Sequence, residues 1–403
     1  MPATPRLLIY EPNAGGHQAE FLTWLADAWP RGGAGTLVLA APADITRGQP
    51  ALEAACEASG GTVSRVEIEP TTAGVGMRAR AATVRHAEPL QRLVDAHRPA
   101  DVLLMSFEHF MLPLSARVRV PGTGRISALS FRPTLHYGAL GGPPAGLRTR
   151  ASRWARAQVV RAAMRHPQFG TFFSLDPTAV PALRALAPGV RVEAVPDPAP
   201  AEPVVRSREA VRAQYGIEAG RHLFVLPGAL DARKGALAVP EALLRLRPDV
   251  AARVAVLLAG RVDPDIEAPL RRALARVARE TPTQVVLRDT FVPPDEIQAH
   301  VAAADTVLLP YSAAHVGSSG FLMRAAGAGV PVVCTEHGLM GYLARTHRLG
   351  RTVADGPDAL ADVLGRAVAA PTASFDAASA AAFAARHTVS AFTGALLSPF
   401  LVP

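Results

Sequence analysis

The sequence is poor in lysine, cysteine and aromatic residues. Of its 42 basic residues only Lys234 is a lysine, and the others are arginines. Its two cysteines, Cys56 and Cys334, lie far apart without metal-ligand or redox spacing, which argues against a disulfide framework and favours a reducing compartment. No apolar run approaches the ~20 residues of a membrane-spanning helix. With 5% aromatics and no nucleic-acid-binding signature, an RNA- or DNA-binding protein is disfavoured.

What remains is a long, apolar and basic chain. Its 403 residues exceed one ordinary core and predict two domains, and 49% hydrophobic residues exclude general disorder. The net charge of +8 arises mainly before residue 201, where 21 basic residues outnumber 15 acidic ones. This excess favours phosphorylated substrates or an anionic membrane surface as partners, with compositional drift towards arginine as the alternative. Without a long apolar leader segment, we expect a cytoplasmic protein.

The first half alternates predicted strands with predicted helices. Residues 6–11 form a buried strand, a turn with Gly15, Gly16 and His17 follows, and residues 18–29 have helical apolar spacing. A strand, glycine turn and helix can hold a phosphate at the helix N-terminus. A plain tight turn is an equal alternative, because the dinucleotide-binding glycine fingerprint is absent.

Polar residues follow two later strands of this half. The strand at 101–105 opens into a predicted loop with Glu108 and His109, and the strand at 125–131 precedes Arg132 and His136. Ligands bind at strand ends in open α/β sheets, so these four residues are candidates, with ordinary solvated loop residues as the alternative for Glu108 and His109. Arg132 and His136 combine a fixed cation with a titratable group.

Two stretches shape the border between the halves. Residues 147–166 carry six arginines with Trp154 and predict a basic, partly amphipathic helix. It either contacts an anionic membrane surface or packs its apolar side on the sheet as a solvated surface helix. Residues 196–203 are rich in proline, hence stiff, and mark the domain boundary.

The second half repeats the strand and helix rhythm and contains two anion-site candidates. Predicted strands lie near 222–226, 254–259, 284–287, 306–309 and 331–334. After the first of them, Arg233 and Lys234 precede a predicted helix at 235–246, where a lysine adds a compact charge for phosphate. A second turn has glycines for close backbone approach and hydroxyls that can bind phosphate; its residues are Gly317, Ser318, Ser319 and Gly320.

Five segments of the second half, together with the Gly15-Gly16 turn, resemble retaining glycosyltransferases of family 4. Those segments are the turn from Gly228 to Gly235, residues 290–296, residues 304–310, residues 325–331 and a closing helix near 383–397. The resemblance implies the GT-B fold, in which two Rossmann-like α/β domains face a central cleft. We expect an N-terminal acceptor domain at 1–196, a C-terminal donor domain at 197–378, and a closing helix at 379–403 that returns to the N-terminal domain.

The resemblance also implies roles for single residues. Lys234, helped by Arg233 and the backbone of residues 317–320, would bind the diphosphate of a nucleotide-sugar, with Gly15, Gly16 and His17 approaching it from the other domain. His136 with Arg132 would be catalytic, Glu108 and His109 would lie on the acceptor side, and neither a metal nor another cofactor would be required. The family's paired glutamates are replaced by Val316 and Arg324, and the arginine that usually follows the first glycine of the lysine turn is Ala229.

The sequence therefore predicts a retaining glycosyltransferase acting on a saccharide or lipid-linked acceptor, with peripheral contact to an anionic membrane as a further expectation and no nucleic-acid partner. The alternative is a catalytically silent GT-B module that binds a sugar nucleotide or a protein partner, favoured by Val316 and Arg324. A nicotinamide-dependent dehydrogenase is disfavoured, because both the glycine fingerprint and the acidic residue for the ribose hydroxyls are missing.

Overall fold

The chain divides into two compact α/β units in a computed structural model. The structure describes residues 5–14, 18–29, 35–70, 86–131, 133, 135–136, 138, 140, 146–200, 204–313 and 315–401. Unit 1 comprises Met1–His136, Ala145–Asp197 and Val389–Pro403, and unit 2 comprises Tyr137–Pro144 and Pro198–Thr388. The main border therefore falls one residue after the expected end of the first domain, at the start of the proline-rich stretch.

Unit 1 contains a seven-stranded sheet in the order β3-β2-β1-β4-β5-β6-β7, and every pairing in it is parallel. Its strands are β1 (Pro5–Tyr10), β2 (Thr36–Pro42), β3 (Val63–Ile68), β4 (Asp101–Leu104), β5 (Arg125–Ser130), β6 (Phe169–Ser174) and β7 (Arg191–Ala194). Since the strands are parallel, their C-terminal ends lie along one edge, and Glu108 and His109 follow β4 at that edge.

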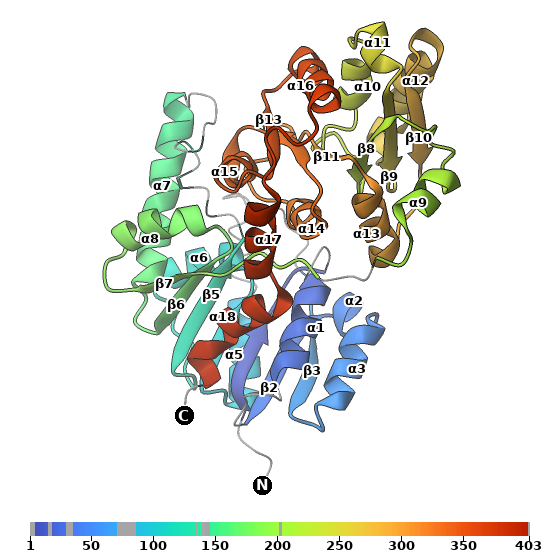
Figure 1. Ribbon diagram of the computed structural model, residues 1–403. Coiled ribbons are helices and arrows are strands. Elements are labelled where there is room, and N and C mark those ends of the chain that lie inside the picture. The colour runs from blue at the N-terminus through green and yellow to red at the C-terminus, as the bar shows by residue number, and fades with distance from the viewer. Residues whose placement is uncertain are drawn as a thin grey trace. The chain divides into compact units, whose positions relative to one another are not determined.

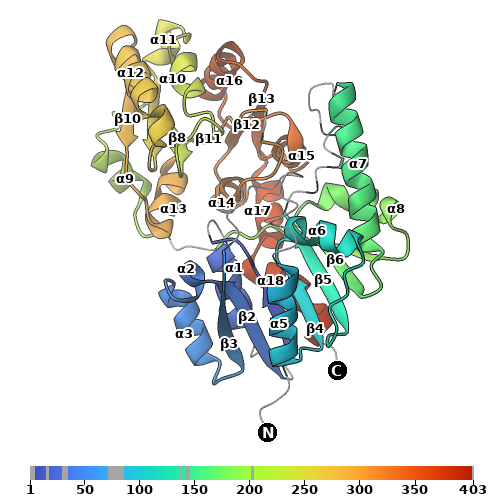
Figure 2. The same cartoon turned by 180° about the vertical axis from the view of Figure 1, so that it is seen from behind.

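Helices cover both faces of this sheet because each strand buries side chains alternately on its two sides. Leu7 and Ile9 pack with α1, α3 and α18, whereas Leu8 and Tyr10 pack with α5, α6, α7 and α8. Figure 1 shows α18 beside α1, and Figure 2 shows α5 on the opposite face. The helices are α1 (Gln18–Ala28), α2 (Ala43–Thr46), α3 (Pro50–Ala58), α5 (Ala87–His97), α6 (Phe107–Ser115), α7 (Leu147–Met164), the short 3-10 helix η4 (Pro177–Ala179), α8 (Val180–Leu186) and α18 (Val389–Leu401).

Unit 2 contains a six-stranded parallel sheet in the order β10-β9-β8-β11-β12-β13. Its strands are β8 (His222–Pro227), β9 (Val254–Ala259), β10 (Gln284–Arg288), β11 (Thr306–Leu309), β12 (Val332–Thr335) and β13 (Gly350–Val353). The helices are α9 (Arg208–Gln214), α10 (Ala238–Leu243), α11 (Pro248–Ala251), α12 (Pro264–Glu280), α13 (Pro294–Ala303), α14 (Gly320–Gly327), α15 (Gly338–Thr346), α16 (Pro357–Ala369) and α17 (Ala377–Arg386). α13, α14, α15 and α17 pack on one face of the sheet, and α10, α12 and α16 pack on the other.

Several expected elements differ from the structure. The predicted loop after residue 105 is wrong, because helix α6 begins at Phe107, directly after its N-cap Ser106. The predicted helix at 235–246 starts only at Ala238, after a run of turns that positive-φ Gly235 permits. The closing segment is two helices, because His387, at φ −105° and ψ 41°, leaves helical geometry after α17. The edge strand β13 was not predicted from the sequence.

Among the described residues, no helix is both long and apolar enough to cross a bilayer.

Candidate functional site

The turn after β8 presents Lys234 at the C-terminal edge of the unit 2 sheet. The Asp231 carboxylate organises this turn: Oδ1 accepts from the backbone N–H of Lys234 at 2.7 Å, and Oδ2 lies 3.1 Å from Arg233 Nη2. The Arg233 guanidinium also lies 5.6 Å from the centre of the Tyr311 ring. Both carboxylate oxygens of Asp231 are thus bonded within the turn, one to the Lys234 backbone and one to Arg233.

The Lys234 ammonium has no carboxylate partner in the part of the chain that the structure describes. The residue is 8% exposed, and its Nζ lies 5.1 Å from the centre of the Phe321 ring. Burial, followed by the neighbouring Arg233 charge, lowers the pKa of Lys234 to about 8, while Asp231 opposes the shift. A buried cation without an ion-pair partner is costly, and an anionic ligand would offset that cost.

Two glycines make room for this arrangement. Gly228 has φ +81°, and a Cβ there would lie 2.7 Å from Lys234 Nζ and 2.6 Å from Phe321 Cε2. Gly235 has φ +77°, and a Cβ there would lie 2.1 Å from the carbonyl oxygen of Pro310. Both positions therefore require glycine, for the left-handed backbone and for the close contacts.

The first turn of α14 lies against Lys234, because Phe321 belongs to that turn. Ser319 is the N-cap: its Oγ accepts from Phe321 N at 3.4 Å and lies 3.0 Å from the Tyr311 hydroxyl. The backbone N–H groups of residues 317–320 have no acceptor among the described residues. Free N–H groups at a helix N-terminus beside a buried ammonium form an anion-binding arrangement.

The structure brings together most of the sequence-predicted donor residues: Arg233, Lys234, Gly317, Ser318, Ser319 and Gly320 all belong to this part of unit 2. Neighbouring polar contacts hold the loop in place, since His315 Nε2 lies 3.0 Å from the Ser318 carbonyl oxygen and Ser312 N donates to the Arg233 carbonyl oxygen at 2.9 Å. Tyr311, His315 and Phe321 were not predicted from the sequence. Their only signal was their position beside the Gly-Ser-Ser-Gly run.

The two positions where the family has glutamates are occupied differently. The Val316 carbonyl oxygen accepts from Leu339 N at 2.9 Å, which ties the loop to α15. Arg324 Nη1 donates to Gln298 Oε1 of α13 at 3.2 Å. Neither side chain can accept a hydrogen bond from a ribose or sugar hydroxyl.

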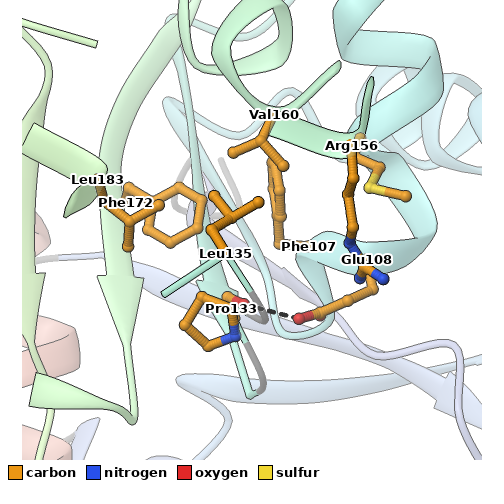
Figure 3. A pocket seen from close by; sticks show the side chains of 10 residues that line it. Phe107, Glu108, Pro133, Leu135, Arg156, Val160, Phe172 and Leu183 are labelled. Carbon is orange, nitrogen blue, oxygen red and sulfur yellow. Dashed lines mark hydrogen bonds between the residues drawn. The ribbon is translucent and has the colours of Figure 1, made fainter. Parts of the chain in front are cut away.

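In unit 1, Glu108 and His109 are neighbours on α6 but face different surroundings. Glu108 lines a small pocket with Leu135 and Arg156, and its Oε1 accepts from Ser130 Oγ at 2.6 Å. Figure 3 shows the Arg156 side chain from α7 pointing toward Glu108. Glu108 thus joins a pocket that combines apolar walls with one carboxylate and one guanidinium.

His109 instead belongs to a polar cluster at the end of β1. Its Nε2 lies 3.0 Å from Asn13 Oδ1. Asn13 in turn donates to Glu11, a carboxyl group that is 1% exposed and whose pKa burial raises to about 7. Sequence reasoning missed Glu11 and Asn13, although an acidic residue directly after the apolar run 7–10 was a usable signal.

His136 makes internal contacts with both ring nitrogens. Its Nδ1 lies 3.0 Å from the Pro133 carbonyl oxygen, and its Nε2 lies 2.7 Å from Thr178 Oγ1 and 3.0 Å from the buried Asp176 Oδ2. These contacts link the segment after β5 to η4, and the catalytic role of His136 stays a prediction. The other predicted residues, Arg132, Gly15, Gly16 and His17, lie outside the described residues.

Residues 221–369 match the family model named Glycosyl transferases group 1, and these residues contain the whole Lys234 and α14 arrangement. A search of curated protein sequences finds no match.

Solved structures are similar over almost the whole chain. A glycosyltransferase from Rickettsia africae ESF-5 is 11% identical with a TM-score of 0.65, covering 98% of both chains. Alr3699/HepE from Anabaena, in complex with UDP and glucose, is 13% identical with a TM-score of 0.63, covering 98% of this chain and 99% of its own. An α,α-trehalose-phosphate synthase (UDP-forming) from Burkholderia xenovorans, in complex with glucose-6-phosphate, is 14% identical with a TM-score of 0.66. The match covers 98% of this chain and 100% of the synthase chain.

At these identities the structural similarity establishes the fold, which is the two-domain α/β architecture of GT-B glycosyltransferases. Combined with the family match over the second unit, the fold supports a glycosyltransferase of the GT-B type.

Proposed function

We propose that this protein transfers a sugar from a nucleotide-sugar donor to a saccharide or lipid-linked acceptor, with retention of anomeric configuration. The single observation that carries the proposal is the buried Lys234 ammonium beside the first turn of α14, which has no carboxylate partner among the described residues.

Unit 2 would bind the donor through its diphosphate. Lys234 supplies a point charge, Arg233 a second cation, and the N–H groups of residues 317–320, at the N-terminal end of α14, would supply further donors. These groups would stabilise the negative charge that develops on the departing diphosphate. The Anabaena protein's complex with UDP and glucose supports a donor of this class.

Unit 1 would bind the acceptor at the C-terminal edge of its sheet. The pocket that Glu108 and Arg156 line is too small to enclose a sugar ring, so the acceptor would lie over it, where these two side chains offer hydrogen-bonding groups of both signs. The glucose-6-phosphate complex of the Burkholderia protein supports a saccharide acceptor. Retention would follow a displacement on the same face of the sugar, in which the departing phosphate helps to deprotonate the acceptor hydroxyl.

The test is a thermal-shift screen against UDP, GDP, ADP, CMP and their glucose conjugates. A ligand at 100 times its dissociation constant stabilises the native state by about 2.7 kcal/mol. We expect one nucleotide class to raise the melting temperature, and Lys234→Ala to lose that rise. Lys234→Met is the matched control, because it keeps the side-chain packing against Phe321 and removes only the charge.

A second outcome would favour the silent module. If a sugar nucleotide stabilises the protein in a Lys234-dependent manner but is never hydrolysed or transferred, the absence of carboxylates at Val316 and Arg324 explains the inactivity. If no nucleotide stabilises the protein, the donor proposal is wrong. In that case Arg324→Glu, which restores the family's residue at that position, should not produce nucleotide binding either.

Helix α7 would supply peripheral contact with an anionic membrane. Its sequence has no acidic residue, and Leu147 and Trp154 are 83% and 67% exposed. Basic residues attract anionic lipids, and exposed apolar side chains insert at the interface. We expect co-sedimentation with phosphatidylglycerol vesicles at low salt, reduced by high salt and by Trp154→Ala. Absence from the pellet under both salt conditions would contradict this.

A further inference from the structure

A network of four polar side chains connects the ends of β1 and β4 in unit 1. Asn13 donates twice to Glu11 Oε1, from its backbone N at 2.8 Å and from Nδ2 at 2.7 Å. Its Nδ2 also lies 2.8 Å from Ser106 Oγ, which in turn lies 3.2 Å from both Glu11 oxygens. The remaining amide atom, Oδ1, lies 3.0 Å from His109 Nε2.

This network determines where the His109 proton lies. The Asn13 amide nitrogen faces two acceptors, Glu11 and Ser106, so its amide oxygen must face His109. An amide oxygen can only accept, and therefore His109 Nε2 must donate. In the neutral ring the proton is then on Nε2, and Nδ1 carries the lone pair.

The other ring nitrogen of His109, Nδ1, is the one that could accept a hydrogen bond from a ligand. It forms no hydrogen bond within the part of the chain that the structure describes. His109 is half-buried in the first turn of α6, directly after β4, at the sheet edge where ligands bind in parallel α/β folds.

The Ser106 side chain bonds to the network and does not cap helix α6. Ser106 occupies the N-cap position of α6, where serine normally caps a free N–H of the first turn. Its side chain makes no such capping bond and contacts Glu11 and Asn13 instead. A buried carboxyl group is also costly unless it is hydrogen-bonded, and Asn13 and Ser106 supply those bonds to Glu11.

We propose that Glu11 and Asn13 are positioning residues that hold His109 with its proton on Nε2, so that Nδ1 accepts a hydrogen bond from a saccharide hydroxyl. The inference rests on the proposed function and adds a recognition group on unit 1 that is separate from the Lys234 site. His109 is the residue that touches the sugar, whereas Glu11 and Asn13 act through it.

The surroundings favour the neutral form of the imidazole. Burial lowers the pKa of His109, and the Glu108 carboxylate on α6 opposes that shift. Across the cluster, His86 lies with its ring centre 5.9 Å away, and its own pKa falls to about 4 through burial and through His109. Tyr10 on β1 lies 3.1 Å from His86 Nδ1, and burial raises its pKa. Glu11 completes the titratable groups around the ring.

The positioning part is tested by NMR of protein labelled with ¹⁵N-histidine, with the His109 signals assigned by their loss in His109→Gln. We expect a proton on Nε2 that exchanges slowly with water because Asn13 holds it. Asn13→Ala should broaden this signal beyond detection, and Asn13→Asp, which keeps an acceptor for Nε2–H, should restore it. A proton found on Nδ1 in the wild type, or a signal unchanged in Asn13→Ala, would overturn the positioning role.

The ligand part is tested on the same samples with glucose, with UDP-, GDP- and ADP-glucose, and with the sugar-free nucleotides. We expect the chemical shift of His109 Nδ1 to change when a sugar-containing ligand is added and to remain unchanged when only the nucleotide is added. The resonances of His222, which is buried in unit 2, should not change with either. No response to any saccharide would overturn the recognition role. That failure is distinguishable from failure of the proposed function, which appears as the absence of Lys234-dependent stabilisation by nucleotides.

Discussion

No described carboxylate pairs with the Lys234 ammonium, and its neighbours raise the free-energy cost of burying it in protonated form. Arg233 precedes it, the Phe321 ring lies 5.1 Å away, and the side chain is buried. A folded-state pKa of about 8 means that protonated Lys234 opposes folding, so between pH 8 and 10.5 stability should rise as the proton is lost. A bound diphosphate would reverse this preference and raise the pKa.

Because the chain has a single lysine, this shift can be measured directly. Reductive methylation with ¹³C-formaldehyde should give one side-chain signal besides the terminal amine. We expect that signal to titrate near pH 8 in the free protein and towards its ordinary value of 10.5 once a nucleotide is bound. A midpoint that nucleotides do not change would contradict diphosphate binding at Lys234.

Glu11 offers a second residue-scale prediction. Its folded-state pKa of about 7 lies above the ordinary 4.5, so the native state binds the extra proton and stability declines as pH rises between those values. Glu11→Gln removes this dependence. We expect the free energy of unfolding of the variant, relative to wild type, to increase by about 1–3 kcal/mol from pH 5 to pH 8. Urea titrations at both pH values measure it, and a constant difference would refute the buried titration.

At the scale of elements, the sequence was most informative where apolar runs were continuous. The strands at 254–259 and 306–309 were predicted with their observed bounds, since buried parallel strands have continuous apolar sequences. Helix α6 was missed because Pro113 and a short length obscured its periodicity. Strand β13 was missed because its sequence, Gly-Arg-Thr-Val, is half polar and has no continuous apolar run.

The candidate site shows the same division. Lys234 and the glycines around it could be predicted, because composition and turn chemistry mark them in the sequence. The cluster of Glu11, Asn13 and His109 could not, since His109 lies more than 90 residues from the other two and only the pairing of β1 with β4 brings it to them. Contacts that depend on sheet order are not local properties of the chain.

The turn between β8 and α10 should tolerate no side chain at Gly235. Gly235→Ala adds a Cβ 2.1 Å from the Pro310 carbonyl oxygen at a φ of +77°. We expect a loss of about 2–4 kcal/mol in the stability of unit 2, from strain and overpacking. The matched control is Gly365→Ala within α16, where a Cβ meets nothing within 4 Å; it should stabilise by about 0.5–1 kcal/mol. Denaturant unfolding distinguishes the two outcomes.

At the scale of the whole molecule, α18 belongs to unit 1 although it follows unit 2 in the sequence. Its Phe392 is fully buried against α1, with its ring centre 4.7 Å from that of Phe21. Leu396 and Phe400 extend the same core. The first unit is therefore closed by the last helix of the chain.

A pair of phenylalanine variants tests this assignment. Phe392→Ala should destabilise unit 1 by about 3–5 kcal/mol, and Phe383→Ala on α17 should destabilise unit 2 by a similar amount, because both side chains are fully buried. Hydrogen exchange read separately in β1 and β8 assigns each loss to its unit. Loss of protection in β8 on Phe392→Ala would contradict the assignment of α18.

The position of α18 has a consequence for biosynthesis. During synthesis, the segments of unit 1 before Asp197 emerge before α18, so the face of their sheet next to α1 lacks Phe392 and Leu396 until α18 has been made. Part of the apolar surface of unit 1 therefore stays uncovered while unit 2, whose described strands and helices all precede α18, is being synthesised. The core of unit 1 is thus completed after that of unit 2, although most of unit 1 is made first.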